Sequence, residues 1–246
     1  MTEKEKTIKN FQELLTILCD LVPHFAVYLK DPELAYDIQY NSDNYLDKEE
    51  WEYFAETDSI RRMMDEAVKI MGTGYYLDHG AYRYVIVPSD LPYVLKFSRN
   101  SYGSGDCPFE TEDCCEMEEM IYESACDKGV SNFFAETFPM KFAYDGYQYS
   151  NFYLMKKYKV NQWRYPTDEE YEKDSSYYDT IDGYDEISDC FDDDCLGLEF
   201  YENYSDEELQ CLLDFFYEFA MCDFHRGNIG YDDDGRPVII DYAFFR

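Results

Sequence analysis

Basic residues are scarce in this chain of 246 residues. Lys and Arg number 21 against 54 Asp and Glu, so the formal net charge is −33. A surface this negative repels phosphates, which disfavours direct binding of DNA or RNA. Two interpretations of the charge stay open. Either it keeps the protein soluble, or it forms a carboxylate array that occupies a nucleic-acid-binding groove on a partner protein with a basic surface.

Long apolar runs and clustered metal ligands are also missing. No run of about 18 apolar residues occurs, as a membrane-spanning helix requires, and residues 1–6 lack the apolar core of a signal peptide. We therefore expect a cytoplasmic protein without membrane contact. No Cys-x-x-Cys pair occurs, and His24, His79 and His225 are far apart, so a structural zinc site is not expected.

Apolar residues nevertheless make up 46% of the chain, which is enough for a folded core. Their spacing predicts helices over residues 7–22, 47–71, 110–128 and 206–221, with a loop over 31–46. Short alternating runs predict strands over 82–87, 93–97, 141–144 and 152–155, and a closing hairpin of 228–231 and 238–241. Two strands, a helix and two more strands in this order indicate an α+β fold.

Residues 166–208 form an acidic segment in which Lys173 is the only basic residue and Asp192–Asp194 stands near the middle. A segment so rich in carboxylates and Tyr is typical of a solvated, partly mobile insertion. It lacks the ligand spacing of a calcium loop.

The run Asp223–Asn228, with the sequence DFHRGN, carries the strongest chemical pattern. An Asp and an Asn five residues apart can point into one cleft, and a hairpin returns Asp241, at the end of the sequence VIID, beside Asn228. Phosphoryl transfer from ATP requires a carboxylate to orient the attacking hydroxyl. It also requires an amide oxygen and a second carboxylate to hold Mg²⁺.

These residues resemble the protein-kinase-like superfamily. Asp223, His225 and Asn228 match the Asp-x-His-x-x-Asn loop of its aminoglycoside-kinase-like members, although Met221 stands where the family usually has His. Asp241, in the sequence IIDYA, matches the metal-binding Asp of the family's Asp-Phe-Gly motif. The resemblance implies that Asp223 is the catalytic base and that Asn228 and Asp241 bind Mg²⁺.

The upstream half extends the resemblance. The sequence LDHGAYRYV at 77–85 aligns with the glycine-rich loop, where Gly80 is kept and Val85 stands at the position that packs on adenine. Lys96, in the sequence YVLKF, aligns with the lysine that pairs with the nucleotide phosphates. The helix over 110–128 supplies the Glu that holds this lysine. Glu118 is the first choice and Glu119 the alternative.

The sequence FYLMKKY at 152–158 resembles the last strand and hinge of the smaller lobe, so Met155 is expected to contact the nucleotide. The expected fold is a two-lobed kinase-like fold with a truncated C-lobe. Residues 1–73 form an N-terminal helical extension, 74–158 the N-lobe and hinge, and 159–246 the C-lobe, which includes the acidic segment. Lys96, Glu118, Asp223, Asn228 and Asp241 are expected to converge on one cleft.

The sequence departs from the family pattern at several positions, so two hypotheses about function stay open. Asp78 and Arg83 replace two glycines of the loop, and the sequence stops five residues after Asp241, before the usual peptide-docking segment. Small kinase-like proteins of this kind resemble proteins commonly encoded by bacteriophages, which implies the host cytoplasm as location. One hypothesis is a minimal phosphotransferase that uses ATP and Mg²⁺. The alternative is a catalytically weak or inactive acidic protein that inhibits a host nucleic-acid-binding or defence protein.

Overall fold

The computed structural model has the mixed α+β composition that the sequence predicts. It describes residues 1–21, 69, 74–79, 83–98, 114–160, 166–181, 183–191, 195–221 and 224–242. The loop expected over 31–46 and the helix expected over 47–71, except Lys69, lie outside these residues. The chain divides into two compact units. Unit 1 contains Met1–Glu116 and Thr137–Lys156, and unit 2 contains Met117–Glu136 and Lys157–Arg246.

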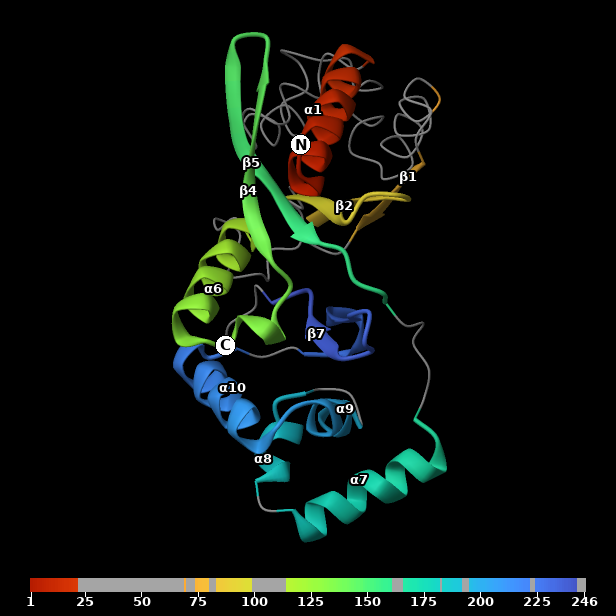
Figure 1. The fold of residues 1–246 in the computed structure, drawn as a ribbon, viewed down its shortest axis with the longest axis vertical. Coiled ribbons are helices and arrows are strands. Elements are labelled where there is room, and N and C mark those ends of the chain that lie inside the picture. The colour runs from red at the N-terminus through yellow and green to blue at the C-terminus, as the bar shows by residue number, and fades with distance from the viewer. Residues whose placement is uncertain are drawn as a thin grey trace, which may run out of the picture. The chain divides into compact units, whose positions relative to one another are not determined.

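Unit 1 is built on a five-stranded antiparallel sheet with the order β1-β2-β3-β5-β4 (Figure 1). The four strands expected from alternation are confirmed, and one more, β1, precedes them. β1 covers part of the segment aligned with the glycine-rich loop, and it pairs with β2 from Tyr75 opposite Pro88 to His79 opposite Tyr84. The strands are β1 (Tyr75–His79), β2 (Arg83–Pro88), β3 (Tyr93–Ser98), β4 (Thr137–Tyr144) and β5 (Tyr147–Lys156).

Helix α1 (Glu3–Leu21) packs on one face of this sheet. Its apolar side chains recur at helical spacing, and Phe11, Leu14 and Leu15 are fully buried. The sequence division placed α1 in a separate extension, whereas the structure gives the helix and the sheet one common core. The buried sheet residues of this core are Tyr75, Tyr84, Ile86, Leu95, Phe97, Met140, Phe142, Tyr149, Phe152 and Leu154.

Unit 2 is mainly helical and contains one short hairpin. The helices expected over 110–128 and 206–221 are confirmed as α6 and α10, and the closing hairpin is confirmed as β6 and β7. Its elements are α6 (Cys114–Lys128), which begins in unit 1, then η1 (Ser131–Phe133), α7 (Asp168–Thr180), α8 (Tyr184–Ser188), α9 (Leu196–Asn203), α10 (Asp206–Phe219), η2 (Arg226–Asn228), β6 (Ile229–Tyr231) and β7 (Pro237–Ile239). None of the helices in the described ranges is long and apolar enough to cross a membrane.

The described part of the acidic segment contains three helices. α7 has no buried residue, in line with the predicted solvated insertion, whereas α8 and α9 have buried residues and are packed. Thr167 and Glu170 form a capping box at the start of α7. Tyr177 and Tyr201 pack edge to face against the fully buried Tyr184, whose hydroxyl donates to Asp174. Tyrosine can build such a core inside an acidic sequence because its ring is apolar and its hydroxyl finds a polar partner. Asp192–Asp194 lies outside the described residues.

Candidate active site

Three residues expected to contact the nucleotide share one face of the unit 1 sheet. Val85 on β2 and Lys96 on β3 are direct cross-strand partners. Met155 on β5 stands opposite Val94, which is two residues from Lys96. Side chains of paired residues, and of residues two apart on a strand, point to the same side of a sheet. This face is the one opposite to α1, because α1 packs on the alternate residues, such as Leu95 and Phe97.

Burial distinguishes Lys96 from the other lysine of the neighbouring strands. Lys96 is 5% exposed and Met155 is 2% exposed, whereas Lys156 at the end of β5 is exposed. A lysine is rarely placed in a buried position unless its ammonium group has polar partners. Lys96 therefore has the setting of a functional or paired lysine.

In unit 2, the buried carboxylate of Glu118 on α6 accepts a hydrogen bond from the backbone amide of Tyr242, with an N–O distance of 3.4 Å. Glu118 is fully buried and Tyr242 is 1% exposed. The Tyr242 hydroxyl in turn donates to the carbonyl oxygen of Ala135 at 2.7 Å. Glu119, the alternative candidate, is half-buried. This hydrogen bond therefore links Glu118 to the residue that directly follows Asp241.

The β6–β7 hairpin places Asn228 opposite Ile240, the residue before Asp241. The backbone carbonyl of Asn228 accepts from the amide of Ile240 at 2.8 Å, and Ile240 directly precedes Asp241. The backbone N–H of Asn228 donates to the backbone carbonyl of His225, also at 2.8 Å. Asn228 is 5% exposed, while Asp241 is half-buried. The hairpin therefore places the Asn228 backbone next to the residue before Asp241, and the convergence of the two side chains on a metal ion stays a prediction.

The loop before the hairpin is held by packing and by a local hydrogen bond. Phe224 is fully buried, and its ring lies 4.6 Å from that of Phe216 on α10 and 5.9 Å from that of Phe191. The His225 imidazole accepts from the Gly227 amide at 3.0 Å. A Cβ atom at Gly227 would approach this ring to 2.8 Å, so a larger residue there would have to displace the His225 imidazole.

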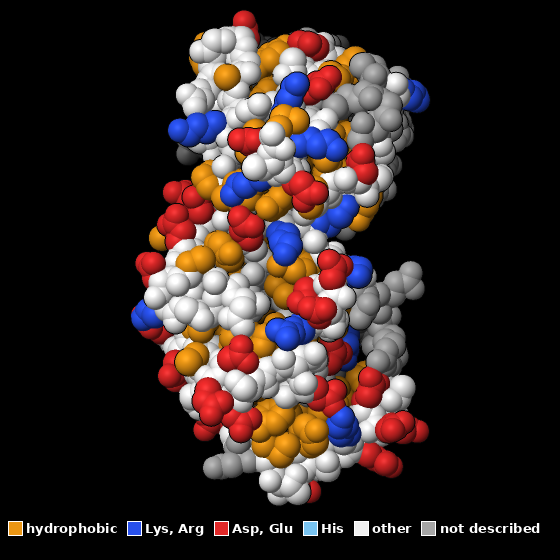
Figure 2. All heavy atoms as spheres, in the orientation of Figure 1, with side chains coloured by type: hydrophobic (Ala, Val, Ile, Leu, Met, Phe, Trp, Pro, Cys, Tyr) orange, Lys and Arg blue, Asp and Glu red, His pale blue; other side chains and the backbone are white. Residues whose placement is uncertain are grey.

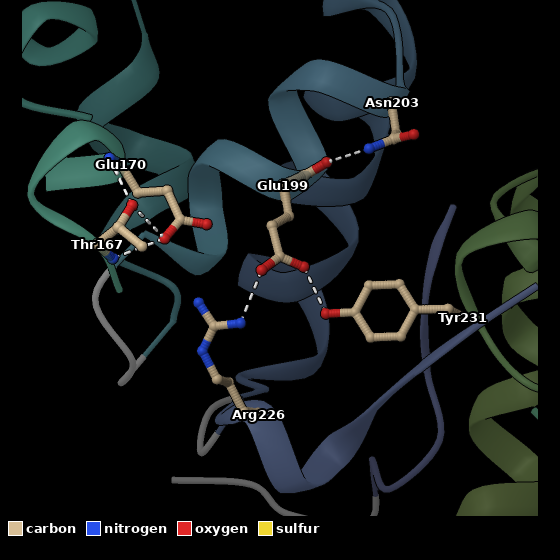
Figure 3. Close-up of polar contacts among 6 residues, drawn as sticks. All are labelled: Thr167, Glu170, Glu199, Asn203, Arg226 and Tyr231. Atoms are coloured by element: carbon tan, nitrogen blue, oxygen red, sulfur yellow. Dashed lines mark hydrogen bonds and ion pairs between the residues drawn. The ribbon is translucent and has the colours of Figure 1, made fainter. Parts of the chain in front are cut away.

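One contact near this loop was not expected from the sequence. Glu199 on α9 accepts from Arg226 Nη1 at 2.7 Å and from the hydroxyl of Tyr231 (Figure 3). Arg226 belongs to the motif, but no role was assigned to it. A basic residue beside the candidate motif in so acidic a chain indicates an ion pair. The sequence does not indicate which carboxylate is the partner, because Glu199 stands 27 residues upstream.

Two of the candidate residues, Gly80 and Asp223, lie outside the part of the chain that the structure describes. The convergence of Lys96 with Glu118, Asn228 and Asp241 stays a prediction. Among the described residues, the three expected on the sheet share a face, and Glu118, Asn228 and Asp241 are linked through the strand end at residues 240–242.

The donor set at the hairpin fits Mg²⁺. An amide oxygen and one carboxylate are hard ligands, and Mg²⁺ is often bound by one or two carboxylates together with substrate phosphates. Within the described ranges, no group of three or more His, Cys, Asp and Glu side chains is arranged to hold a metal ion by itself. A Mg²⁺ ion held by Asn228 and Asp241 would therefore complete its coordination with water or nucleotide phosphate oxygens.

No protein-family model matches the sequence, and no curated protein matches it.

Proposed function

We propose that this protein is a minimal phosphotransferase of the protein-kinase-like superfamily that uses ATP and Mg²⁺. The observation that carries the proposal is the short network at residues 240–242. Ile240 is bonded to Asn228 and Tyr242 to Glu118, so Asp241 lies between two backbone bonds to the other candidate residues. The Glu118 bond is the side-chain-specific part of this network, because a buried carboxylate on α6 accepts from the residue that follows Asp241.

In this proposal each candidate residue has a separate role in nucleotide binding or phosphoryl transfer. Val85 and Met155 contact the adenine, and Lys96 pairs with the phosphates and is held by Glu118. Asn228 and Asp241 hold Mg²⁺, which neutralises charge on the transferred phosphoryl group. Asp223 orients the acceptor hydroxyl and takes its proton. The side chains supply position and charge, which is the main requirement of phosphoryl transfer.

The test is transfer of the labelled γ-phosphate of ATP to water or to the protein's own hydroxyl groups, with Mg²⁺ present. Asp223→Asn should lower the rate by about 10²–10⁴ and leave ATP affinity nearly unchanged, because Asp223 acts on the acceptor. Asp232→Asn, in the hairpin turn, is the matched control and should retain the wild-type rate. Equal loss of ATP affinity in Asp223→Asn argues against the assigned role.

A second candidate function is supported by helix α7. None of its residues is buried, and its first turn carries Asp168, Glu169 and Glu170. A helix with a solvated acidic face can bind a basic surface on a partner protein, as the alternative hypothesis requires. The acidic side chains of the face drawn in Figure 2 are, however, spread over the surface with Lys and Arg among them. The hydrogen bonds at residues 240–242 keep the phosphotransferase as the first candidate.

A further inference from the structure

Glu199 is the one acidic residue of α9 that joins two separate parts of the motif region. One carboxylate oxygen pairs with Arg226 Nη1 at 2.7 Å, and the other accepts from the Tyr231 hydroxyl. Figure 3 shows both partners reaching toward Glu199 from the loop and from the hairpin. The side chains of Arg226 and Glu199 are 10% and 24% exposed, so the pair is largely shielded from water.

The two partners lie on either side of Asn228. Arg226 opens η2, and Tyr231 ends β6. Between them, the Asn228 backbone is fixed by the His225 carbonyl and the Ile240 amide. One carboxylate therefore restrains both ends of the six-residue stretch 226–231 that contains the candidate metal ligand.

A second bond ties α9 to the other strand of the hairpin. Tyr204, directly after α9, is buried, and its hydroxyl donates to the carbonyl oxygen of Pro237 at 2.7 Å. α9 thus contacts β6 through Glu199 and β7 through Tyr204. The other acidic residue of α9, Glu202, is more exposed than Glu199. It forms an ion pair with Lys173, and the two side chains are 38% and 45% exposed. Exposed pairs of that kind contribute little.

We propose that Glu199 is a positioning residue for the Mg²⁺ and nucleotide site, acting through Arg226 and Tyr231 on Asn228. The inference rests on the proposed function. It makes α9 of the acidic segment a part of the active-site scaffold. Partners of metal ligands typically change metal affinity about 10- to 100-fold when they are removed, because they fix ligand orientation.

The experiment measures ATP binding by calorimetry over a range of Mg²⁺ concentrations, on the full chain. Glu199→Gln should raise the Mg²⁺ concentration for half-maximal binding by about 10- to 100-fold. The matched control on the same helix, Glu202→Gln, should leave it unchanged. The double variant Glu199→Arg with Arg226→Glu restores the charge pair and should recover part of the loss. A Glu199→Gln protein with the wild-type Mg²⁺ dependence overturns the proposal.

Amide hydrogen exchange gives a readout that needs no nucleotide. Glu199→Gln should speed exchange of the Asn228 and Ile240 amides at least about tenfold, while the Leu212 amide in α10 keeps its wild-type rate. Should Glu199→Gln fail to fold, Tyr231→Phe removes one bond and should show a smaller change of the same kind. Unchanged exchange in a folded variant overturns the positioning role. Absence of Mg²⁺-dependent ATP binding in the wild type instead overturns the proposed function.

Discussion

The backbone amide of Tyr242 donates to the carboxylate of Glu118, 124 residues upstream, and both residues are buried. The bond joins α6 to the residue after Asp241. A buried amide that loses its acceptor costs about 1–3 kcal/mol. Substitutions at Glu118 therefore test whether Glu118 or Glu119 of α6 belongs to the candidate active site.

We expect Glu118→Ala to lower the free energy of unfolding by about 1–3 kcal/mol, because the Tyr242 amide then loses its acceptor. Glu118→Gln keeps an acceptor oxygen and should lose less stability, while ATP affinity still falls through the missing charge. Urea denaturation and ATP titration measure the two effects. Glu119→Ala is the control, and a larger loss there than at Glu118 contradicts the assignment.

Gly230 in β6 tests how closely the hairpin is packed. A Cβ atom at this position would lie 2.6 Å from Tyr158 Cβ and 3.0 Å from Ile240 Cγ2. Gly230→Ala should therefore destabilise the protein by about 1–3 kcal/mol and displace the strand that precedes Asp241. The effect is measured as a shift in the urea midpoint.

Gly235 in the hairpin turn is the control for Gly230. It has φ +84° with no atom near its added Cβ, so Gly235→Ala tests backbone strain alone. A left-handed residue other than glycine costs about 1–2 kcal/mol. Only Gly230→Ala should also weaken Mg²⁺-dependent ATP binding, and equal binding in both variants counts against a role for the hairpin.

The buried hydroxyl of Tyr75 should make the stability of unit 1 depend on pH in the alkaline range. Its hydroxyl is buried and has no hydrogen-bond partner in the described part of the chain, and burial, with Asp90 and Glu13 nearby, raises its pKa from 10.0 to about 12. Below pH 10 the hydroxyl is protonated in both states. Between about pH 10 and 12 the unfolded state releases the proton first, so stability falls with rising pH.

Tyr75→Phe should remove this contribution and flatten the loss of stability between pH 10 and 12. At pH 7 the variant should be neutral or up to about 2 kcal/mol more stable, because an unsatisfied buried hydroxyl is removed. Tyr76→Phe is the control, since Tyr76 is 57% exposed. Thermal unfolding across pH 8–12 measures both variants. A parallel pH profile for Tyr75→Phe and wild type refutes the prediction.

Much of the fold follows from the sequence. The apolar spacing of Leu209, Leu212, Leu213 and Phe216 predicts α10, and the alternating residues around the Asp232–Gly235 turn predict β6 and β7. Local patterns of this kind report directly on burial. They also predict that the backbone of Asn228 lies next to the end of the second strand, because a short hairpin fixes its own register, and the bond from the Ile240 amide to Asn228 agrees with this.

The acidic segment shows what local patterns miss. α7 has no buried residue, so its sequence carries no apolar periodicity, and Tyr184 is buried by partners from α7 and α9. The pairing of Glu199 with Arg226 is likewise a tertiary contact. In a segment crowded with carboxylates, the sequence offers many equivalent partners, and only the packing of α9 selects one.

The second candidate function predicts a strong salt dependence. Neutralising Asp168, Glu169 and Glu172 on α7 to Asn and Gln should weaken binding to a Lys-rich peptide more than neutralising Glu116, Glu123 and Asp127 on α6. Both sets are exposed. Charge interactions at about 10 Å are largely screened near 0.1 M salt, so the difference should shrink at high salt. Equal weakening by both triple variants indicates a general charge effect without an α7 binding surface.

The central claim is tested most directly by calorimetric titration of ATP with Mg²⁺ into wild type, Lys96→Met and Lys156→Met. Lys96 is buried on the sheet face shared with Val85, whereas the exposed Lys156 pairs with Tyr93, which packs against the α1 core. The proposed function predicts binding by the wild type and by Lys156→Met, and at least about tenfold weaker binding by a folded Lys96→Met. Wild type without Mg²⁺-dependent ATP binding, or equal affinity in all three proteins, contradicts it.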